Sequence, residues 1–397
     1  MVRIQRNKLK LENMLLKYSL WITVLLLLVS CKENLKTESS KAIEQTGSVK
    51  KTFAKFEPKD GEVILFVGQE LDAIGGTERD TNGYWDHFEA PGGVTMYTDI
   101  MPGLTETFLD HSFTYSGLNG IWETDDWGDG AENMSIPLSD KDFENCALAI
   151  GLAIIDNEEK IAAGEHDELI KKMGEFFLSL GDRPVFLRIG FEFAGPWNRY
   201  DKEAYLMAYK RIKDKLDEQG ITNVAYVWQS AGFGHSRESL ESWYPGDKYV
   251  DWCGYSFFAS YEQAKMIEFA ESKGKPVFIA EATPTSTDYE NDPNGTTGLT
   301  KEFILSNPEQ AERAWEEWFV PFFETINENP KTVKAISYIN GNWREKPRWQ
   351  VNNTFKNIDS RLQLSDELIQ KWNTEIGNEK YLKSSPDLFE YLAGDKK

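Results

Sequence analysis

Two glutamates stand at the ends of apolar runs that resemble buried β-strands. Glu192 closes the run that begins at Pro184, and Glu281 closes the run that begins at Pro276. A parallel barrel presents catalytic side chains at the carboxyl ends of its strands, so two such runs would bring two carboxyl groups to one rim. Two carboxyl groups that flank a glycosidic bond can hydrolyse it. The pair predicts glycosidase chemistry, whereas one such glutamate alone would more simply be a solvated or salt-bridged residue.

The expected strand around Glu192 also carries an arginine. Arg188, Gly190 and Glu192 lie two residues apart, and alternate residues of a strand share one face. A cation below the carboxyl group would help to orient Glu192 and its neighbour across the site. In a retaining glycosidase one carboxyl group protonates the leaving oxygen and the other attacks the anomeric carbon, at a separation of roughly 5 Å. Strands three positions apart around a barrel can meet that demand.

Polar and aromatic residues near the strand ends are candidates for binding a sugar. The turn after Glu192 contains Trp197 and Asn198, for which packing within the loop is the alternative. Trp343 stands at a rim position suited to stacking under a sugar ring, and core packing is its alternative. Glu70, at the end of the first strand, is a reserve carboxylate. The expected substrate-binding residues are Arg188, Trp197, Asn198, Trp228, Gln229, Tyr255 and Trp343.

Eight apolar runs alternate with longer amphipathic segments along the chain. Apolar residues recur at helical spacing in the segment 202–219, and Gly220 follows as a stop signal. Strands that alternate with helices in this way predict an α/β fold, a (β/α)8 TIM barrel with elaborated loops. The excursion 101–142 is expected to form a loop or subdomain over the cleft. The expected strands are 63–67, 94–100, 146–154, 184–193, 223–229, 249–258, 276–281 and 335–343, and the expected helices are 166–180, 202–219, 261–273 and 308–327.

Composition excludes several classes of function. The net charge of −21 argues against a nucleic-acid partner and against a broad polyanion-binding face. The four histidines show no metal-ligand spacing, and the acidic segment 125–132 lacks the full spacing of a calcium-binding loop, so we expect no metal and no cofactor. Aromatic residues make up 13% of the chain, which suits stacking on sugars. We expect a monomer whose partner is a polysaccharide or oligosaccharide.

The N-terminal segment predicts a lipid anchor. A basic stretch precedes a short apolar run that ends in the sequence LVSC at Cys31, which resembles a bacterial lipobox. Cys31 would be the lipidated first residue of the mature chain, and an uncleaved signal anchor is the alternative. Because Lys32 follows the cysteine, we expect an outer-membrane lipoprotein that faces the periplasm or the cell surface. The expected organisation is a signal peptide over 1–31, a polar flexible tether over 32–57 and one catalytic domain over 58–395.

The two glutamates and their surroundings resemble the clan A glycoside hydrolases. The acid on the fourth strand, the nucleophile on the seventh, Arg188 four residues before the acid, and the segments 243–254 (WYPGDKYVDWCG) and 274–281 (GKPVFIAE) carry the likeness. Within the clan, the chain is most similar to family 26, the β-mannanase family. The resemblance implies a (β/α)8 barrel that acts on β-linked sugars with retention, with Glu192 as the acid/base and Glu281 as the nucleophile.

Three departures from the family pattern indicate a divergent member. Phe191 stands where the family usually has His before the acid/base, and Ser256 and Phe258 stand where Asp and then Tyr are common. Ala282 and Thr283 replace an aromatic–glycine pair that often follows the nucleophile. We expect a lipid-anchored retaining β-glycosidase, endo-acting on a plant or algal polysaccharide such as mannan, xylan or a related β-glycan. The alternative is a surface glycan-binding protein on the same scaffold that has lost turnover.

Overall fold

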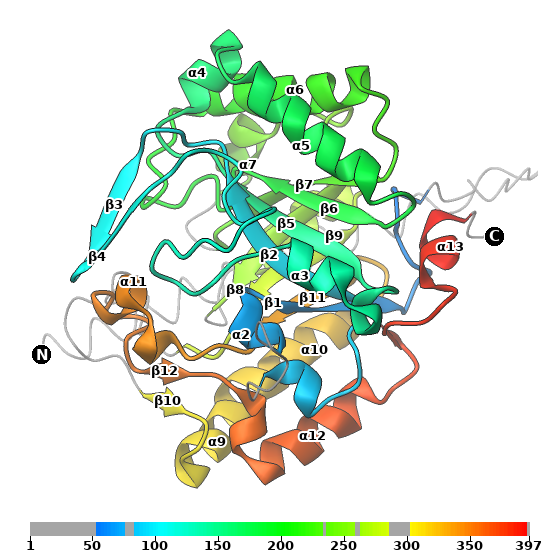
Figure 1. Ribbon diagram of the computed structural model, residues 1–397. Coiled ribbons are helices and arrows are strands. Elements are labelled where there is room, and N and C mark those ends of the chain that lie inside the picture. Colours follow the sequence, from blue (N-terminus) through cyan, green and yellow to red (C-terminus); the bar gives the residue numbers. More distant parts are fainter. Residues whose placement is uncertain (1–52, 76–82, 233–235, 259–262, 286–301, 395–397) are drawn as a thin grey trace, which may run out of the picture. The chain divides into compact units, whose positions relative to one another are not determined.

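Eight parallel strands form a closed barrel in the computed structural model (Figure 1). The structure describes residues 53–75, 83–232, 236–258, 263–285 and 302–394, so Cys31, the signal segment and most of the expected tether lie outside the described residues. β11 pairs with both β9 and β1, which closes the barrel. The (β/α)8 fold and all eight expected strands are confirmed. The strands are β1 Val63–Gly68, β2 Gly93–Asp99, β5 Ala147–Ala153, β6 Val185–Ile189, β7 Val224–Ser230, β8 Trp252–Phe257, β9 Val277–Ala282 and β11 Val333–Ile339.

Helices connect successive strands and cover the barrel (Figure 1). The expected helix 308–327 is interrupted by a π-helical turn, Trp315–Phe319. Pro321 lacks a backbone N–H and its ring would clash with the preceding turn of a regular helix, and a π turn just before it relieves that conflict. The longer helices are α4 Glu158–Ala163, α5 Asp167–Ser179, α6 Lys202–Glu218, α7 Arg237–Trp243, α8 Gln263–Lys273, α9 Pro308–Ala314, α10 Val320–Glu328, α12 Asp366–Ile376 and α13 Leu388–Ala393. The shorter ones are α2 Leu71–Ile74, α3 Ser135–Ser139 and α11 Pro347–Gln350.

The excursion between β2 and β5 contains a β-hairpin. β3 Thr105–Phe108 pairs antiparallel with β4 His111–Thr114, and the hairpin projects from the barrel, in cyan in Figure 1. Arg348 of α11 fastens it: the guanidinium forms an ion pair with Glu106, lies 4.6 Å from the ring centre of Phe108 and donates to the Tyr115 hydroxyl. The segment after β2 is therefore joined to the segment after β11.

Aromatic side chains fill the interior at the amino end of the barrel. Phe66, Phe186 and Phe278 meet with ring centres 5.0 to 5.9 Å apart. Phe56, from the chain before β1, lies 5.8 Å from the Phe186 ring and is buried. Trp252 donates its indole N–H to the Lys55 carbonyl at 2.7 Å. Residues 53–57, which we expected to belong to a flexible tether, pack against the barrel because they cover its apolar end.

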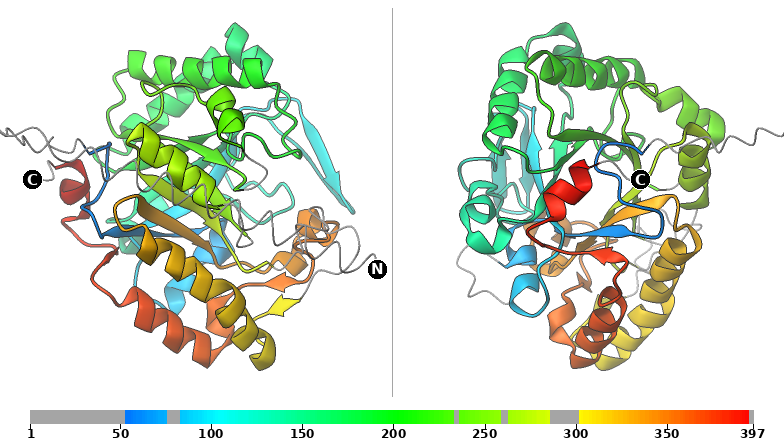
Figure 2. Two further views of the ribbon diagram at one scale, coloured as in Figure 1. Left: turned by 180° about the vertical axis from the view of Figure 1, so that it is seen from behind. Right: turned by 90° about the vertical axis from the view of Figure 1, so that its right-hand side faces the viewer.

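α13 lies beside the segment that precedes β1 at this end of the barrel, as both views in Figure 2 show. Leu388 and Leu392 of α13 belong to the same buried cluster as Phe56. A two-residue strand, β13 Tyr381–Leu382, extends the sheet by pairing with β1. The segment before the first barrel strand and the segments after the last one therefore cover the amino end of the barrel. The carboxyl end remains for the site.

Phe56→Ala should lower the free energy of unfolding by about 3 kcal/mol, because it removes a buried aromatic ring from the closed end of the barrel. Chemical denaturation measures the change. Met207→Ala is a matched control: Met207 lies exposed on α6, so its loss should change stability by less than about 0.5 kcal/mol. Equal stability of the Phe56 variant and the unaltered protein would show that this segment is a tether after all.

Candidate active site

A β-bulge in β9 turns Glu281 into the barrel. Ile279 pairs with Tyr255 of β8, but the next pair joins Glu281 to Ser256, so β9 has one extra residue. The same irregularity appears against β11. Ala280 belongs to the interior cluster, and Glu281 contacts the interior side chain Arg188, so two consecutive residues face inward. Bulges re-aim side chains in this way next to active sites.

Glu192 reaches the same region by a different route. β6 ends at Ile189, and both Gly190 and Glu192 adopt left-handed backbone conformations, with φ of 53° and 52°. Our inference that Glu192 shares a face with Arg188 by strand alternation is therefore wrong, because the strand ends before Glu192. Such a φ is unfavourable for a glutamate and must be held by its surroundings. The Asn198 side-chain amide holds it by donating to the carbonyls of Phe191 and Glu192, at 2.9 and 3.0 Å.

A chain of hydrogen bonds joins the two carboxyl groups. Arg188 is fully buried and donates from Nη1 to Glu281 Oε1 at 2.6 Å and to Gln229 Oε1 at 2.9 Å. Gln229 Nε2 donates to Glu281 Oε1 at 3.0 Å and to Ser256 Oγ at 3.1 Å. The Ser256 hydroxyl donates to Glu192 Oε1 at 2.6 Å. Arg188 therefore hydrogen-bonds to Glu281 directly and is connected to Glu192 only through Gln229 and Ser256.

The two carboxyl groups differ in their electrostatic surroundings. Burial, and then the neighbouring charge of Glu281, raise the pKa of Glu192 to about 8, against the opposing effects of hydrogen bonds from Ser256 and Trp197 and of the Arg188 charge. Glu192 therefore holds a proton at neutral pH, as a general acid must. Glu281 instead forms an ion pair with the buried guanidinium of Arg188, at 2.6 Å. A carboxyl group with a raised pKa beside a second carboxyl group that is paired with a buried cation suits acid-assisted nucleophilic attack.

Two aromatic rings flank the arginine. The guanidinium carbon of Arg188 lies 4.8 Å from the ring centre of Tyr97 and 5.5 Å from that of Phe191. The two rings meet edge to face at 5.2 Å. Phe191, which stands where family 26 usually has His, thus packs against the cation. Tyr97 was not among the expected site residues, although its alternation with Thr95 in the second apolar run would have indicated an inward side chain.

Comparison with known proteins gives the family. A model of glycosyl hydrolase family 26 matches residues 153–291, which include both glutamates. A β-1,3-xylanase from an Alcaligenes species is 30% identical over 358 residues, covering 85% of this chain and 68% of its own. A β-1,3-xylanase from a Vibrio species is also 30% identical, covering 85% and 69%. The chain belongs to glycosyl hydrolase family 26. It is a glycoside hydrolase.

A solved structure supports the fold of this family 26 enzyme. GH26C from Muricauda sp. MAR_2010_75 aligns with a TM-score of 0.51 at 12% identity, covering 83% of this chain and 89% of the other. An engineered protein aligns with a TM-score of 0.53 at 14% identity, covering 86% and 79%. At these identities the likeness concerns the barrel and not the substrate.

Trp197 of the family 26 enzyme lies beside Glu192. Its indole Nε1 donates to Glu192 Oε2 at 2.8 Å, and 43% of the residue's surface is exposed. Gln229 is also at the site, where it bridges Arg188, Ser256 and Glu281. Asn198 supports the backbone of the site, because its side-chain amide donates to two backbone carbonyls. Ser256, which we noted only as a departure from the family pattern, directly contacts the expected acid.

Trp228 and Tyr255 do not face the site. Gln229 and Ser256 point into the barrel, so the residues before them point outward into the helical layer. Trp228 is fully buried and stacks on Phe193, with ring centres 4.3 Å apart. Tyr255 is likewise fully buried in the cluster between barrel and helices. The expectation that these two residues bind substrate is therefore wrong, because their side chains lie on the outer face of their strands.

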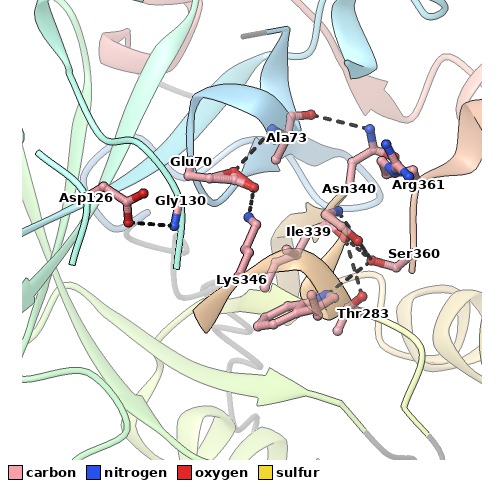
Figure 3. A network of polar contacts seen from close by, with 12 residues as sticks. Glu70, Ala73, Asp126, Gly130, Thr283, Ile339, Asn340, Lys346, Ser360 and Arg361 are labelled. Atoms are coloured by element: carbon pink, nitrogen blue, oxygen red, sulfur yellow. Dashed lines mark hydrogen bonds and ion pairs between the residues drawn. The ribbon is translucent and has the colours of Figure 1, made fainter. Parts of the chain in front are cut away.

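Trp343 packs in an aromatic cluster. It is 2% exposed, its ring stacks on Phe355 at 4.5 Å, and its indole donates to Ser360 Oγ at 3.3 Å. The reserve carboxylate, Glu70, caps α2 by accepting from the Ala73 amide and forms an ion pair with Lys346 (Figure 3). Core packing, our alternative for Trp343, is what the structure shows, and Glu70 has a structural role.

Carboxylates of the acidic segment 125–132 accept hydrogen bonds from nearby backbone amides. Asp125 accepts from the Gly120 amide, and Asp126 accepts from the Gly128 amide. Asp126 also accepts from the Gly130 amide (Figure 3). Across the described part of the chain, no group of three or more His, Cys, Asp or Glu residues is arranged to hold a metal ion. Among the helices in the same described ranges, none has the length and apolar character needed to cross a membrane.

Glu192→Gln should make the protein's stability less dependent on pH. Because the pKa of Glu192 is about 8 in the folded protein and ordinary in the unfolded chain, the folded state binds the proton more tightly, and stability falls as pH rises through that range. The neutral variant lacks this loss. We expect its Tm relative to the unaltered protein to increase between about pH 5 and about pH 9 in thermal melts. A constant difference would contradict the raised pKa.

Proposed function

We propose that this family 26 enzyme is an endo-acting, retaining β-glycoside hydrolase in which Glu192 is the acid/base and Glu281 the nucleophile. The observation that carries the proposal is the hydrogen-bond chain that connects a carboxyl group with a raised pKa to one paired with a buried arginine. The alternative of a glycan-binding protein without turnover is disfavoured, because the chain is a glycoside hydrolase and both carboxyl groups are present.

The geometry supports Oε2 of Glu281 as the attacking oxygen. Arg188 and Gln229 both donate to Oε1, and within the described ranges of the chain Oε2 has no such donor. Oε2 attacks the anomeric carbon while the bond to the glycosidic oxygen breaks and Glu192 transfers its proton to that oxygen. Water then attacks the same carbon, Glu192 takes a proton from it, and the bond to Glu281 breaks. Two inversions at one carbon give retention.

The relatives support a set of candidate substrates. The two curated relatives are named as β-1,3-xylanases, so β-1,3-xylan heads the panel of candidate polysaccharides, with β-mannan and other β-linked xylans after it. The exposed indole of Trp197, adjacent to the acid, supports action on a polymeric sugar because it offers an apolar face beside the reacting bond. Chain-length analysis of the early products distinguishes internal from terminal cleavage.

Glu281→Ala should abolish turnover of every substrate, because no covalent intermediate can form. Glu192→Ala should lower kcat on the natural polysaccharide by roughly 10²–10⁴-fold but spare the first step for aryl glycosides, whose leaving groups need little protonation. Steady-state and burst kinetics on both substrates measure the difference. Comparable losses on activated and natural substrates in the Glu192 variant would contradict its role as the acid.

We also propose that Cys31 is lipidated and that the enzyme is an outer-membrane lipoprotein. The basic stretch, the short apolar run and the LVSC sequence support this, and Lys32 favours the outer membrane. Cys31→Ala should move the protein from the membrane fraction to the soluble fraction and stop incorporation of a labelled fatty acid, measured in cells that express the full chain. Cys253→Ala, in a buried thiol, is the control. Unchanged membrane association of the Cys31 variant would contradict lipidation.

A further inference from the structure

The hydrogen-bond chain between the carboxyl groups runs in one direction. A guanidinium only donates, so Gln229 must turn its carbonyl oxygen toward Arg188 and its amide nitrogen toward Ser256 and Glu281. Ser256 Oγ therefore receives a hydrogen bond from Gln229. The one hydrogen of the Ser256 hydroxyl is directed at Glu192 Oε1, 2.6 Å away.

Both oxygens of Glu192 accept hydrogen bonds in this arrangement. Oε1 accepts from Ser256 and Oε2 from the indole of Trp197, which can only donate. The geometry is therefore that of the ionised carboxylate, the form that serves as a base in the second step of the reaction. In the first step Glu192 must carry a proton, and one of these two hydrogen bonds must then give way.

The surroundings decide which bond gives way. Ser256 is 4% exposed, and among the residues that the structure describes its hydroxyl has Glu192 as the only acceptor. A proton on Oε1 would leave that buried hydroxyl hydrogen unpaired, which is unfavourable. Trp197 is 43% exposed, so its N–H can bond to water when Oε2 is protonated. Losing the hydrogen bond from Trp197 therefore costs less free energy than losing the one from Ser256.

We propose that Glu192 carries its catalytic proton on Oε2, that each protonation releases the Trp197 indole, and that Ser256 is the positioning residue that holds Oε1. The inference rests on the proposed role of Glu192. It means that the exposed ring beside the reacting bond alternates between two states within each turnover. Trp197 is bound to the carboxylate while Glu192 acts as base and is released while Glu192 acts as acid.

The charged and titratable groups around Glu192 come from several elements. Glu281 lies on β9, Arg188 on β6, Tyr97 on β2 and Tyr200 on the segment before α6. Burial and Glu281 raise the pKa of Glu192 to about 8, while Ser256, Trp197 and Arg188 lower it. Trp197 should therefore be released below that pH and bound above it.

Intrinsic tryptophan fluorescence, titrated without substrate, tests the proposal. The unaltered protein should show one step near the pKa of Glu192, and both Trp197→Phe and Glu192→Gln should lack it. Trp122→Phe is the matched control, because Trp122 is also exposed, at 51%, but its ring meets Phe176 instead of the acid. The control should retain the step. Absence of the step in the unaltered protein, or its persistence in either Trp197→Phe or Glu192→Gln, would overturn the proposal.

Ser256→Ala provides the second measurement. Removing a hydroxyl that donates to the carboxylate should move the fluorescence step, and the basic limb of the kcat/KM profile, upward by about one pH unit. Ser256→Thr keeps the hydroxyl and should restore the original midpoint. An unmoved midpoint in Ser256→Ala would remove Ser256 from the proposal. The fluorescence titration needs no substrate. Full activity of Glu192→Ala would therefore refute the proposed function and leave the result of the titration unchanged.

Discussion

The buried ion pair between Arg188 and Glu281 is the interaction on which the site depends. The guanidinium is wholly removed from solvent and Glu281 is nearly so, at an N–O distance of 2.6 Å. A charge in such a place is tolerated only when it is paired and hydrogen-bonded, and loss of one partner typically costs about 3–5 kcal/mol. Gln229 and the rings of Tyr97 and Phe191 supply further contacts to the cation. The ion pair thereby fixes the position of Glu281 and, through Gln229 and Ser256, that of Glu192.

Two local distortions let the barrel build this site. The regular alternation of a strand cannot put consecutive residues inside, and the bulge at Ala280 and Glu281 does so. A regular strand also cannot direct Glu192 toward Ser256, and the left-handed turn that Asn198 holds does so. Phe66, Phe186 and Phe278 pack against one another in the buried interior of the same barrel, and close packing of this kind resists movement of the strands.

The sequence predicts the barrel well because its strands are continuous apolar runs, and each of the eight was recognisable by that property. It also predicts Glu192, Glu281, Arg188, Gln229 and Trp197 as residues of one region. Alternation would have excluded Trp228 and Tyr255 once Gln229 and Ser256 were assigned to the interior. The packing of Trp343 on Phe355 depends on residues that follow the barrel strands, and the burial of Phe56 on the whole barrel end, so no local pattern reveals either. The role of Ser256 arises from its contacts with Gln229 on β7 and with Glu192 in the turn after β6.

The central claim is that Glu281 forms a covalent bond to the sugar while Glu192 supplies and removes the proton. The most direct test is peptide mass spectrometry of the Glu192→Ala variant, quenched during reaction with an aryl β-glycoside, since without the base the intermediate should accumulate. The account predicts a glycosyl mass on the peptide that contains Glu281. Cleavage of the aryl glycoside with no adduct, and a product of inverted anomeric configuration, would contradict it.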